Sequence, residues 1–295
     1  MSSPKLAVVV ASVNGLPYLA DCLEALEARA PEAEVVVADW TDEATRQLVR
    51  ERFPKVKLLS FDEPMAVPEL RAAGIFASGA PYVALIEDHC NVREGWAERL
   101  VSAHEVGHSV VGGSIRNSPY LRIRDWAAFF CEYSRYMEPA PAGEVDDLPG
   151  MNVSYDRRAL DAIDDLLHEG RWESWLHGRL LERGFVLWCE PAAVLDHAKD
   201  FGFVEFLSQR YHYSRSYAGM RNAELGGKRL LFALGSPLIM PLMYWRIARN
   251  VLARRRHRRE LALATPLILL YMGVWAGGEA IGYTLGGGRS LLQVR

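Results

Sequence analysis

The chain has 295 residues, half of them hydrophobic, and a formal net charge of −3 at pH 7. This length allows one large domain with an appendage, and the hydrophobic content is at the upper end of ordinary globular usage. The four cysteines form no close pair in the sequence, which argues against a disulfide framework or a zinc knuckle and favours a reducing compartment.

The charge is unevenly distributed along the chain. Residues 225–259 contain one Lys, eight Arg and no acidic residue, a charge of +9, so the rest of the chain carries −12. A basic block set in apolar sequence and attached to an acidic body favours a membrane surface as partner. No nucleic acid partner is predicted, because nothing else in the chain resembles a nucleic-acid-binding module.

The first part of the chain alternates short apolar runs with stripes of helical spacing. The predicted strands are 6–11, 34–39, 56–59 and 81–86, and the predicted helices between them are 16–30, 43–52 and 68–78. This alternation predicts an α/β fold with a parallel sheet and right-handed crossovers.

Three side chains that can bind metals follow the central strand, 81–86: Glu87, Asp88 and His89. Ligands of open α/β sheets bind at the carboxyl ends of such strands. Carboxylates with an imidazole suit a divalent cation, and a divalent cation suits a diphosphate. The alternative interpretation is a charged turn after a buried strand.

The next hundred residues mix strands and helices around a proline-rich acidic loop, 138–149. The predicted strands are 109–115, 150–155, 185–189 and 193–197. The predicted helices are 95–104, 122–137, 157–168, 172–183 and 203–220.

Several motifs fall in one order along residues 5–200. They are a first strand that ends near Asn14, Asp39 at the end of the second strand, the triplet Glu87-Asp88-His89, Gly150-Met151-Asn152 before Arg157-Arg158, Trp172-Glu173 ahead of Leu176 and Arg179-Leu180, and His197. In this order they resemble a family 2 glycosyltransferase with the GT-A fold. The resemblance implies a nucleotide-diphospho-sugar transferase domain with a mostly parallel central sheet over 1–200, and a helical membrane-associated segment over 201–295.

The chain also departs from the family pattern. Glu87-Asp88-His89 stands in place of Asp-x-Asp, and Trp172-Glu173 stands in place of the Glu-Asp pair that usually carries the base. These departures suggest a divergent subgroup.

The resemblance implies a donor nucleotide site and a metal site. Donor contacts are expected from Ser12, Asn14, Asp39, Arg71, Glu87 and Asp88. A divalent metal, Mn²⁺ or Mg²⁺, is expected on His89, Asp88 and His197. For Asp39 the alternative is a turn or capping residue, and for Arg71 it is a solvated helix position.

On the acceptor side the resemblance implies that Glu173 is the general base of an inverting transfer. Its alternative is an ordinary first-turn Glu favoured by the helix dipole. Asn152, Trp172 and Trp175 are expected to line the acceptor site, and the alternative for the two Trp side chains is a place in the core.

The C-terminal segment holds two uncharged stretches, 230–245 and 261–278, separated by an arginine cluster at 254–259. A two-span hairpin with a cytosolic catalytic domain would place this cluster outside, against the positive-inside rule. We therefore expect a peripheral or monotopic protein on the cytoplasmic face of the cell membrane, with arginines on anionic lipids. The alternative is a helical pair at a homo-oligomer interface.

Together these features predict a metal-dependent, inverting glycosyltransferase of polysaccharide biosynthesis. The donor would be a nucleoside diphosphate sugar, with a UDP-sugar favoured, and the acceptor a lipid-linked or membrane-proximal glycan. The alternatives are a polyprenyl-phosphate glycosyltransferase, which needs less help from a base, and a non-catalytic nucleotide-sugar-binding subunit.

Overall fold

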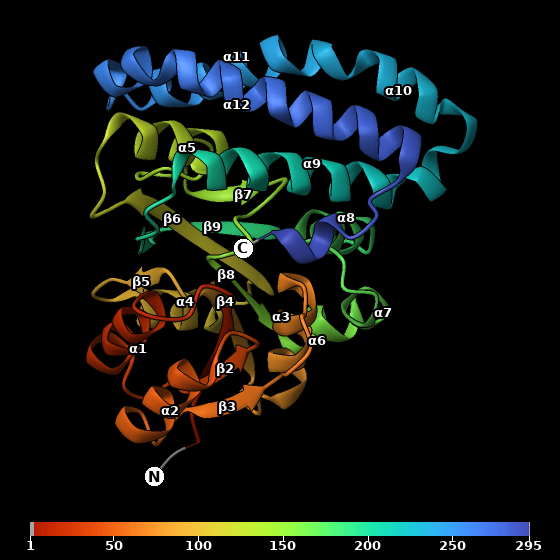
Figure 1. The fold of residues 1–295 in the computed structure, drawn as a ribbon. Coiled ribbons are helices and arrows are strands. Elements are labelled where there is room, and N and C mark those ends of the chain that lie inside the picture. Colours follow the sequence, from red (N-terminus) through yellow and green to blue (C-terminus); the bar gives the residue numbers. More distant parts are fainter. Residues whose placement is uncertain (1–2, 295) are drawn as a thin grey trace. The chain divides into compact units, whose positions relative to one another are not determined.

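The computed structural model describes residues 3–294 and divides the chain into two compact units (Figure 1). The first unit takes the chain up to Pro119 together with Tyr136–Lys199. The second takes Tyr120–Arg135 and the chain from Asp200 onward. The stretch Tyr120–Arg135 thus belongs to the second unit, although it lies inside the range 1–200 predicted for the transferase domain.

The first unit is built on a nine-stranded sheet within the described residues. Its strand order is β3-β2-β1-β4-β8-β6-β9-β5, with β7 also paired to β9. In chain order the strands are β1 (Leu6–Ser12), β2 (Glu34–Asp39), β3 (Lys57–Ser60), β4 (Tyr82–Glu87), β5 (Cys90–Val92), β6 (Val110–Asn117), β7 (Gly143–Val145), β8 (Val153–Asp156) and β9 (Leu187–His197).

The half of the sheet from β3 to β4 is parallel, as the alternating sequence predicts. Every residue of β1 is buried, which is typical of a central strand covered on both faces. The crossovers are α1 (Tyr18–Arg29), α2 (Glu43–Arg52) and α3 (Val67–Ala77). Helix α3 presses closely on β1, because a Cβ on Gly74 would lie 2.2 Å from Val9 Cγ1. This close packing holds α3 directly against β1.

The other half of the sheet adds antiparallel strands. Strand β8 pairs antiparallel with both β4 and β6, and β9 runs parallel to β6. The two short strands predicted at 185–189 and 193–197 are one strand, β9, whose register with β6 shifts between Gly113 and Ser114. Four helices complete the unit: α4 (Trp96–Glu105), α6 (Arg157–Asp161), α7 (Asp164–His168) and α8 (Glu173–Glu182).

The second unit is helical, with α5 (Ile123–Tyr133), α9 (Phe203–Leu225), α10 (Arg229–Gly235), α11 (Ile239–Ala253) and α12 (Arg258–Leu285). Helix α12 contacts the other four and packs most extensively along α9 (Figure 1). The two backbones approach closely, since a Cβ on Gly282 would lie 2.5 Å from the carbonyl oxygen of Arg215. Gly226–Ala253 and Arg258–Leu285 are each long and apolar enough to cross a membrane, by length and composition alone.

Candidate functional site

The carboxyl ends of three parallel strands meet at one edge of the first unit's sheet. In the strand register Ser12 lies beside Asp39, and Ala11 lies beside Glu87. The polar residues that close β1, β2 and β4 are therefore neighbours, as expected for a ligand site in an open α/β sheet.

Asp88 binds the loop that follows β1. Its Oδ2 accepts from the backbone N–H groups of Val13, Asn14 and Gly15 at 2.9, 2.6 and 3.1 Å, and its Oδ1 accepts from Asn14 Nδ2 at 2.7 Å. Burial alone would raise the pKa of the Asp88 carboxyl, but hydrogen bonds and the charge of His89 outweigh it, so the pKa lies below its usual value. Asp88 is fully buried and shapes the loop, and its role toward metal or donor stays a prediction.

Asn14 therefore owes its position to Asp88. Its side chain is half-buried, and Nδ2 also lies 3.3 Å from His89 Nδ1. Gly15 adopts a φ of +67°, the left-handed conformation that lets three consecutive N–H groups converge on one carboxylate.

His89 lies among acidic and imidazole groups. Its Nε2 is 3.3 Å from Glu87 Oε2, and its ring meets that of His197 edge to face with centroids 4.9 Å apart. Burial, together with the charges of His89 and Lys199, holds the pKa of His197 well below its usual value, so this imidazole is neutral. In the described residues, no group of three His, Cys, Asp or Glu side chains is arranged to share one metal ion. Of the three predicted ligands, His89 and His197 come together, and Asp88 Oδ1 lies 3.2 Å from His89 Nδ1 while Asp88 Oδ2 accepts from the loop after β1.

Arg71 joins the two remaining carboxylates. It is buried on α3, and its Nη2 donates to Glu87 Oε1 at 2.6 Å while its Nη1 donates to Glu173 Oε1. Burial alone would lower the pKa of the Arg71 guanidinium, but the charges of Glu173 and Glu87 outweigh it and the pKa is raised. Oxygen Oε2 of Glu173 lies over Gly150, where an added Cβ would be 2.6 Å away.

Asp39 is also engaged by its own surroundings. Ser12 Oγ and Thr41 Oγ1 donate to Oδ1 at 2.8 and 2.7 Å, while Thr41 N and Arg46 Nε donate to Oδ2 at 3.2 and 3.0 Å. Asp39 and Ser12 are both fully buried. In the structure Asp39 and Ser12 close the β2 turn, as the alternative interpretation of Asp39 expects, and their contact with a nucleotide stays a prediction.

Asn152 lies inside the sheet of the first unit. It is fully buried, its Oδ1 accepts from Trp96 Nε1 at 2.8 Å, and its Nδ2 donates to the carbonyl oxygens of Ser114 and Ala193, each at 3.0 Å. This side chain bridges strands and fills the place where β9 leaves its register with β6. Contact of Asn152 with the acceptor stays a prediction, and the structure shows this side chain inside the sheet.

The two predicted acceptor tryptophans differ. Trp172 is only 3% exposed and belongs to the core, in line with the alternative interpretation. Trp175 is half-buried, and the Arg171 guanidinium lies 5.9 Å from its ring centroid. Of the two, only Trp175 is partly exposed.

A buried hydrogen-bond network on the same helix as Glu173 was not predicted. His177 Nδ1 lies 2.7 Å from Asp147 Oδ1, and His177 Nε2 lies 3.0 Å from the Tyr155 hydroxyl. Tyr136 also donates to Asp147 Oδ2 at 2.7 Å. Burial and the nearby charge of Glu173 hold the pKa of Tyr155 well above its usual value. The signal for this network was the i, i+4 spacing of Glu173 and His177, which puts both on the buried face of α8.

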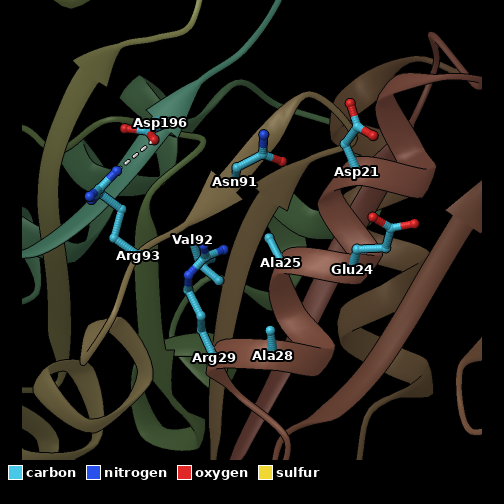
Figure 2. Close-up of a pocket in the computed structure, with 9 residues that line it drawn as sticks. All are labelled: Asp21, Glu24, Ala25, Ala28, Arg29, Asn91, Val92, Arg93 and Asp196. Atoms are coloured by element: carbon cyan, nitrogen blue, oxygen red, sulfur yellow. Dashed lines mark hydrogen bonds and ion pairs between the residues drawn. The ribbon is translucent and has the colours of Figure 1, made fainter.

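A separate charged pocket of 400 Å³ lies beside α1 and β5 (Figure 2). Its lining includes Asp21 and Glu24 from α1, and Asp196 from β9, whose carboxylate pairs with Arg93 at 3.0 Å. None of the predicted site residues lines this pocket.

Known proteins share the fold of this chain. The mannosyltransferase PcManGT from Pyrobaculum calidifontis, solved with GDP-Man and Mn²⁺, is 14% identical, with a TM-score of 0.58 over 95% of this chain and 88% of that one. S. aureus TarS 1-349 is 15% identical, with a TM-score of 0.51 over 96% of this chain and 92% of that one. TarS 1-349 has also been solved with UDP-GlcNAc. No curated protein sequence matches this chain.

The sequence itself matches the family described as "Glycosyl transferase family 2" over residues 7–163, which is more than half of the chain. This range runs from β1 through the acidic triplet to the residue before α7, so Glu173 on α8 lies outside it. The order of the strands, the GT-A neighbours and the match agree with the resemblance drawn from the sequence. The chain is a glycosyltransferase of family 2 with the GT-A fold.

Proposed function

We propose that this protein is a metal-dependent, inverting enzyme that transfers a sugar from a nucleoside diphosphate to a membrane-proximal acceptor. The observation that supports it best is the group formed by Glu87, His89, His197 and Glu173 on the first unit. This group combines neutral imidazole, carboxylates and one guanidinium, Arg71, at the strand ends where GT-A folds bind their ligands.

The divalent metal of this proposal would be held by His89 and His197, with Glu87 beside them. Imidazole and carboxylate are ligand types that Mn²⁺ accepts. In the described residues these groups are not arranged to share one ion, so the side chains would have to reorient as the metal and the diphosphate bind. A metal bound there would neutralise the charge that develops on the leaving nucleoside diphosphate. PcManGT was solved with GDP-Man and Mn²⁺, and TarS with UDP-GlcNAc, so both nucleotide classes are candidates for this chain.

Glu173 would take the proton of the acceptor hydroxyl as that hydroxyl attacks the anomeric carbon. Its Oε1 is bound by Arg71, and its Oε2, over Gly150, is the oxygen left to accept the proton. Trp175, half-buried two residues along α8, would offer its ring to the acceptor sugar.

The metal proposal is tested by calorimetric titration of the whole protein with UDP and with GDP, each in MnCl₂ or in EDTA. One of the two nucleotides is expected to bind much more tightly with Mn²⁺, and at 100 times its Kd to stabilise the protein by about 2.7 kcal/mol. His89→Ala should remove most of this metal dependence. His168→Ala, at a largely exposed histidine of α7, is the matched control and should retain it. Equal affinities with and without Mn²⁺ for both nucleotides would contradict the metal assignment.

We propose that the protein acts at the cytoplasmic surface of a membrane. On α10 and the turn after it, Leu234 and Leu238 are 82% and 74% exposed, and Trp245 on α11 is 55% exposed. The Arg249 guanidinium lies 4.7 Å from the Trp245 ring centroid. An exposed apolar face bordered by arginines suits the interface of an anionic leaflet.

The packing of α12 favours an in-plane arrangement over a transmembrane one. Helix α12 lies along α9, and α9 contains Arg210, Arg215 and Arg221. If α12 crossed the bilayer, α9 would bring these three charges into the hydrocarbon, which is costly. We therefore propose that the helices of the second unit lie on the leaflet without crossing it, near an acceptor held at the membrane.

A further inference from the structure

Arg71 holds two acids that come from distant parts of the chain. One is Glu87, at the end of β4, and the other is Glu173, at the first position of α8. The Arg71 side chain is 4% exposed, and among the described residues its Nε meets no hydrogen-bond partner. All of its contacts are therefore made by the two terminal nitrogens, one for each carboxylate.

This arrangement determines how the Glu173 carboxylate is turned. The terminal torsion of a Glu side chain is broad, so a carboxylate without a partner presents either oxygen. Here Oε1 is bound by Arg71 and Oε2 lies against Gly150, where an added Cβ would be 2.6 Å away. Proton transfer requires the accepting oxygen within hydrogen-bond reach of the donor, and small misplacements slow such steps strongly.

We infer that Arg71 is the positioning residue of the general base: it fixes the orientation of Glu173 and ties that orientation to Glu87 on the donor side. This inference rests on the proposed function, in which Glu173 is the base. In this role Arg71 touches neither the acceptor nor the bond that breaks; it acts through Glu173. A lysine would not replace it, because one ammonium lacks the planar fork that reaches two carboxylates at once.

Two other roles for Arg71 predict different results. If Arg71 only holds the fold together, its replacement lowers the unfolding temperature and leaves the turnover of folded protein unchanged. If Arg71 only binds the donor diphosphate, its replacement weakens nucleotide affinity and leaves turnover at saturation unchanged. A positioning role predicts a loss in kcat with nearly unchanged affinity for UDP and GDP.

The experiment is a double-mutant cycle of Arg71→Lys and Glu173→Gln on the whole protein. Release of UDP from UDP-GlcNAc and of GDP from GDP-mannose is measured in MnCl₂, with UDP and GDP affinities by calorimetry. Arg71→Lys should lower kcat by ~10–10²-fold, the effect of a misplaced group, and Glu173→Gln by ~10²–10⁴-fold, the range for general base catalysis. The double variant should match Glu173→Gln alone, because an Arg71 that acts through Glu173 has nothing left to orient.

Arg157→Lys is the matched control. Arg157 is a half-buried arginine of the same unit whose guanidinium donates to the backbone carbonyls of Ala80 and Ser78. Its replacement should change thermal stability without lowering the turnover of folded protein.

Losses in kcat that multiply in the double variant would overturn the positioning role, and so would a weaker nucleotide affinity that accounts for the whole effect of Arg71→Lys. A different result would contradict the proposal that Glu173 is the base. In that case Glu173→Gln would turn over at the wild-type rate, as expected for a lipid phosphate acceptor. If Arg71→Lys does not fold, Gly150→Ala is the second test, since its Cβ would lie 2.6–2.8 Å from Oε2, Cδ and Cγ of Glu173 and so displace the carboxylate while Arg71 is kept. Gly150→Ala should lower kcat at unchanged UDP and GDP affinity, and full turnover would overturn the inference.

Discussion

At the scale of single residues, the carboxylates of the candidate site are of two kinds. Asp39 and Asp88 are fully buried, and every oxygen accepts hydrogen bonds from nearby donors. Glu87 and Glu173 keep one oxygen away from Arg71. A carboxylate whose lone pairs are all engaged stabilises a loop, whereas one with a remaining lone pair is able to bind a cation or take a proton.

This distinction predicts the effect of Asp88→Asn. The amide keeps the shape of the side chain but has one acceptor oxygen for a site that offers several donors, including the N–H groups of Val13 and Gly15. We expect the free energy of unfolding to fall by about 1–3 kcal/mol, the range for buried groups left unsatisfied. The loss should be the same in Mn²⁺ and in EDTA, measured by urea denaturation.

Asp62→Asn is the control for Asp88→Asn, because the Asp62 side chain is 95% exposed. Its unfolding free energy should stay within about 0.5 kcal/mol of the parent. A stable Asp88→Asn protein with weaker Mn²⁺-dependent nucleotide binding would instead support Asp88 as a metal ligand.

At the scale of elements, the sequence predicted the parallel half of the sheet well. Apolar runs and helical stripes alternate locally, so strands and crossovers leave short-range signals, and the cap of α2, where Asp42 Oδ1 accepts from Thr45 N, is equally local. The antiparallel half was harder to predict. The pairing of β8 with β4, and the single strand β9 with its register shift, depend on contacts between segments far apart in the chain.

The candidate site divides in the same way. Glu87, His89 and Glu173 occupy positions that the motif order predicted, because each follows or begins an element that is visible in the sequence. The partners of Asp88 in the loop after β1 lie more than 70 residues away, and those of the Asn152 side chain lie 38 to 56 residues away. Side chains that bind backbone groups across such distances leave no local pattern in the sequence. The position of a polar residue in a motif therefore does not predict whether its side chain is exposed.

Helix α12 offers a test at this scale, because two of its glycines face different surroundings. A Cβ on Gly282 would lie 2.5 Å from the Arg215 carbonyl oxygen, while one on Gly277 meets nothing within 4 Å. Gly282→Ala should therefore destabilise the protein by about 1–3 kcal/mol through overpacking. Gly277→Ala should stabilise it by about 0.5–1 kcal/mol, because alanine is the better helix former.

The two glycine variants are compared by thermal unfolding in the same detergent buffer. Opposite shifts of the unfolding temperature are expected. Equal shifts would show that α9 and α12 are not in close contact in solution, and would weaken the argument that α12 cannot cross a membrane alone.

At the scale of the whole molecule, charge is unevenly distributed along the chain. Residues 225–259 carry +9 and the remainder carries −12. Four arginines of the cluster 254–259 are exposed: Arg255, Arg256, Arg258 and Arg259. The fifth arginine of that cluster, Arg254, donates to the carbonyl oxygens of Asn250 and Arg135 and so has a structural task.

We expect these four exposed arginines to hold the protein on anionic lipid. Replacing all four with Gln should weaken binding to vesicles of phosphatidylcholine with phosphatidylserine by about 4 kcal/mol, near 10³-fold, since each basic residue at such a surface contributes ~1 kcal/mol. Residual binding should persist in high salt, because exposed apolar side chains such as Leu234 remain inserted. The control replaces four exposed arginines of the first unit, Arg29, Arg50, Arg52 and Arg99, and should bind as the parent does. Unchanged sedimentation of the first variant with these vesicles, together with a dimer in size-exclusion chromatography, would instead favour the oligomer interface for the helices of the second unit.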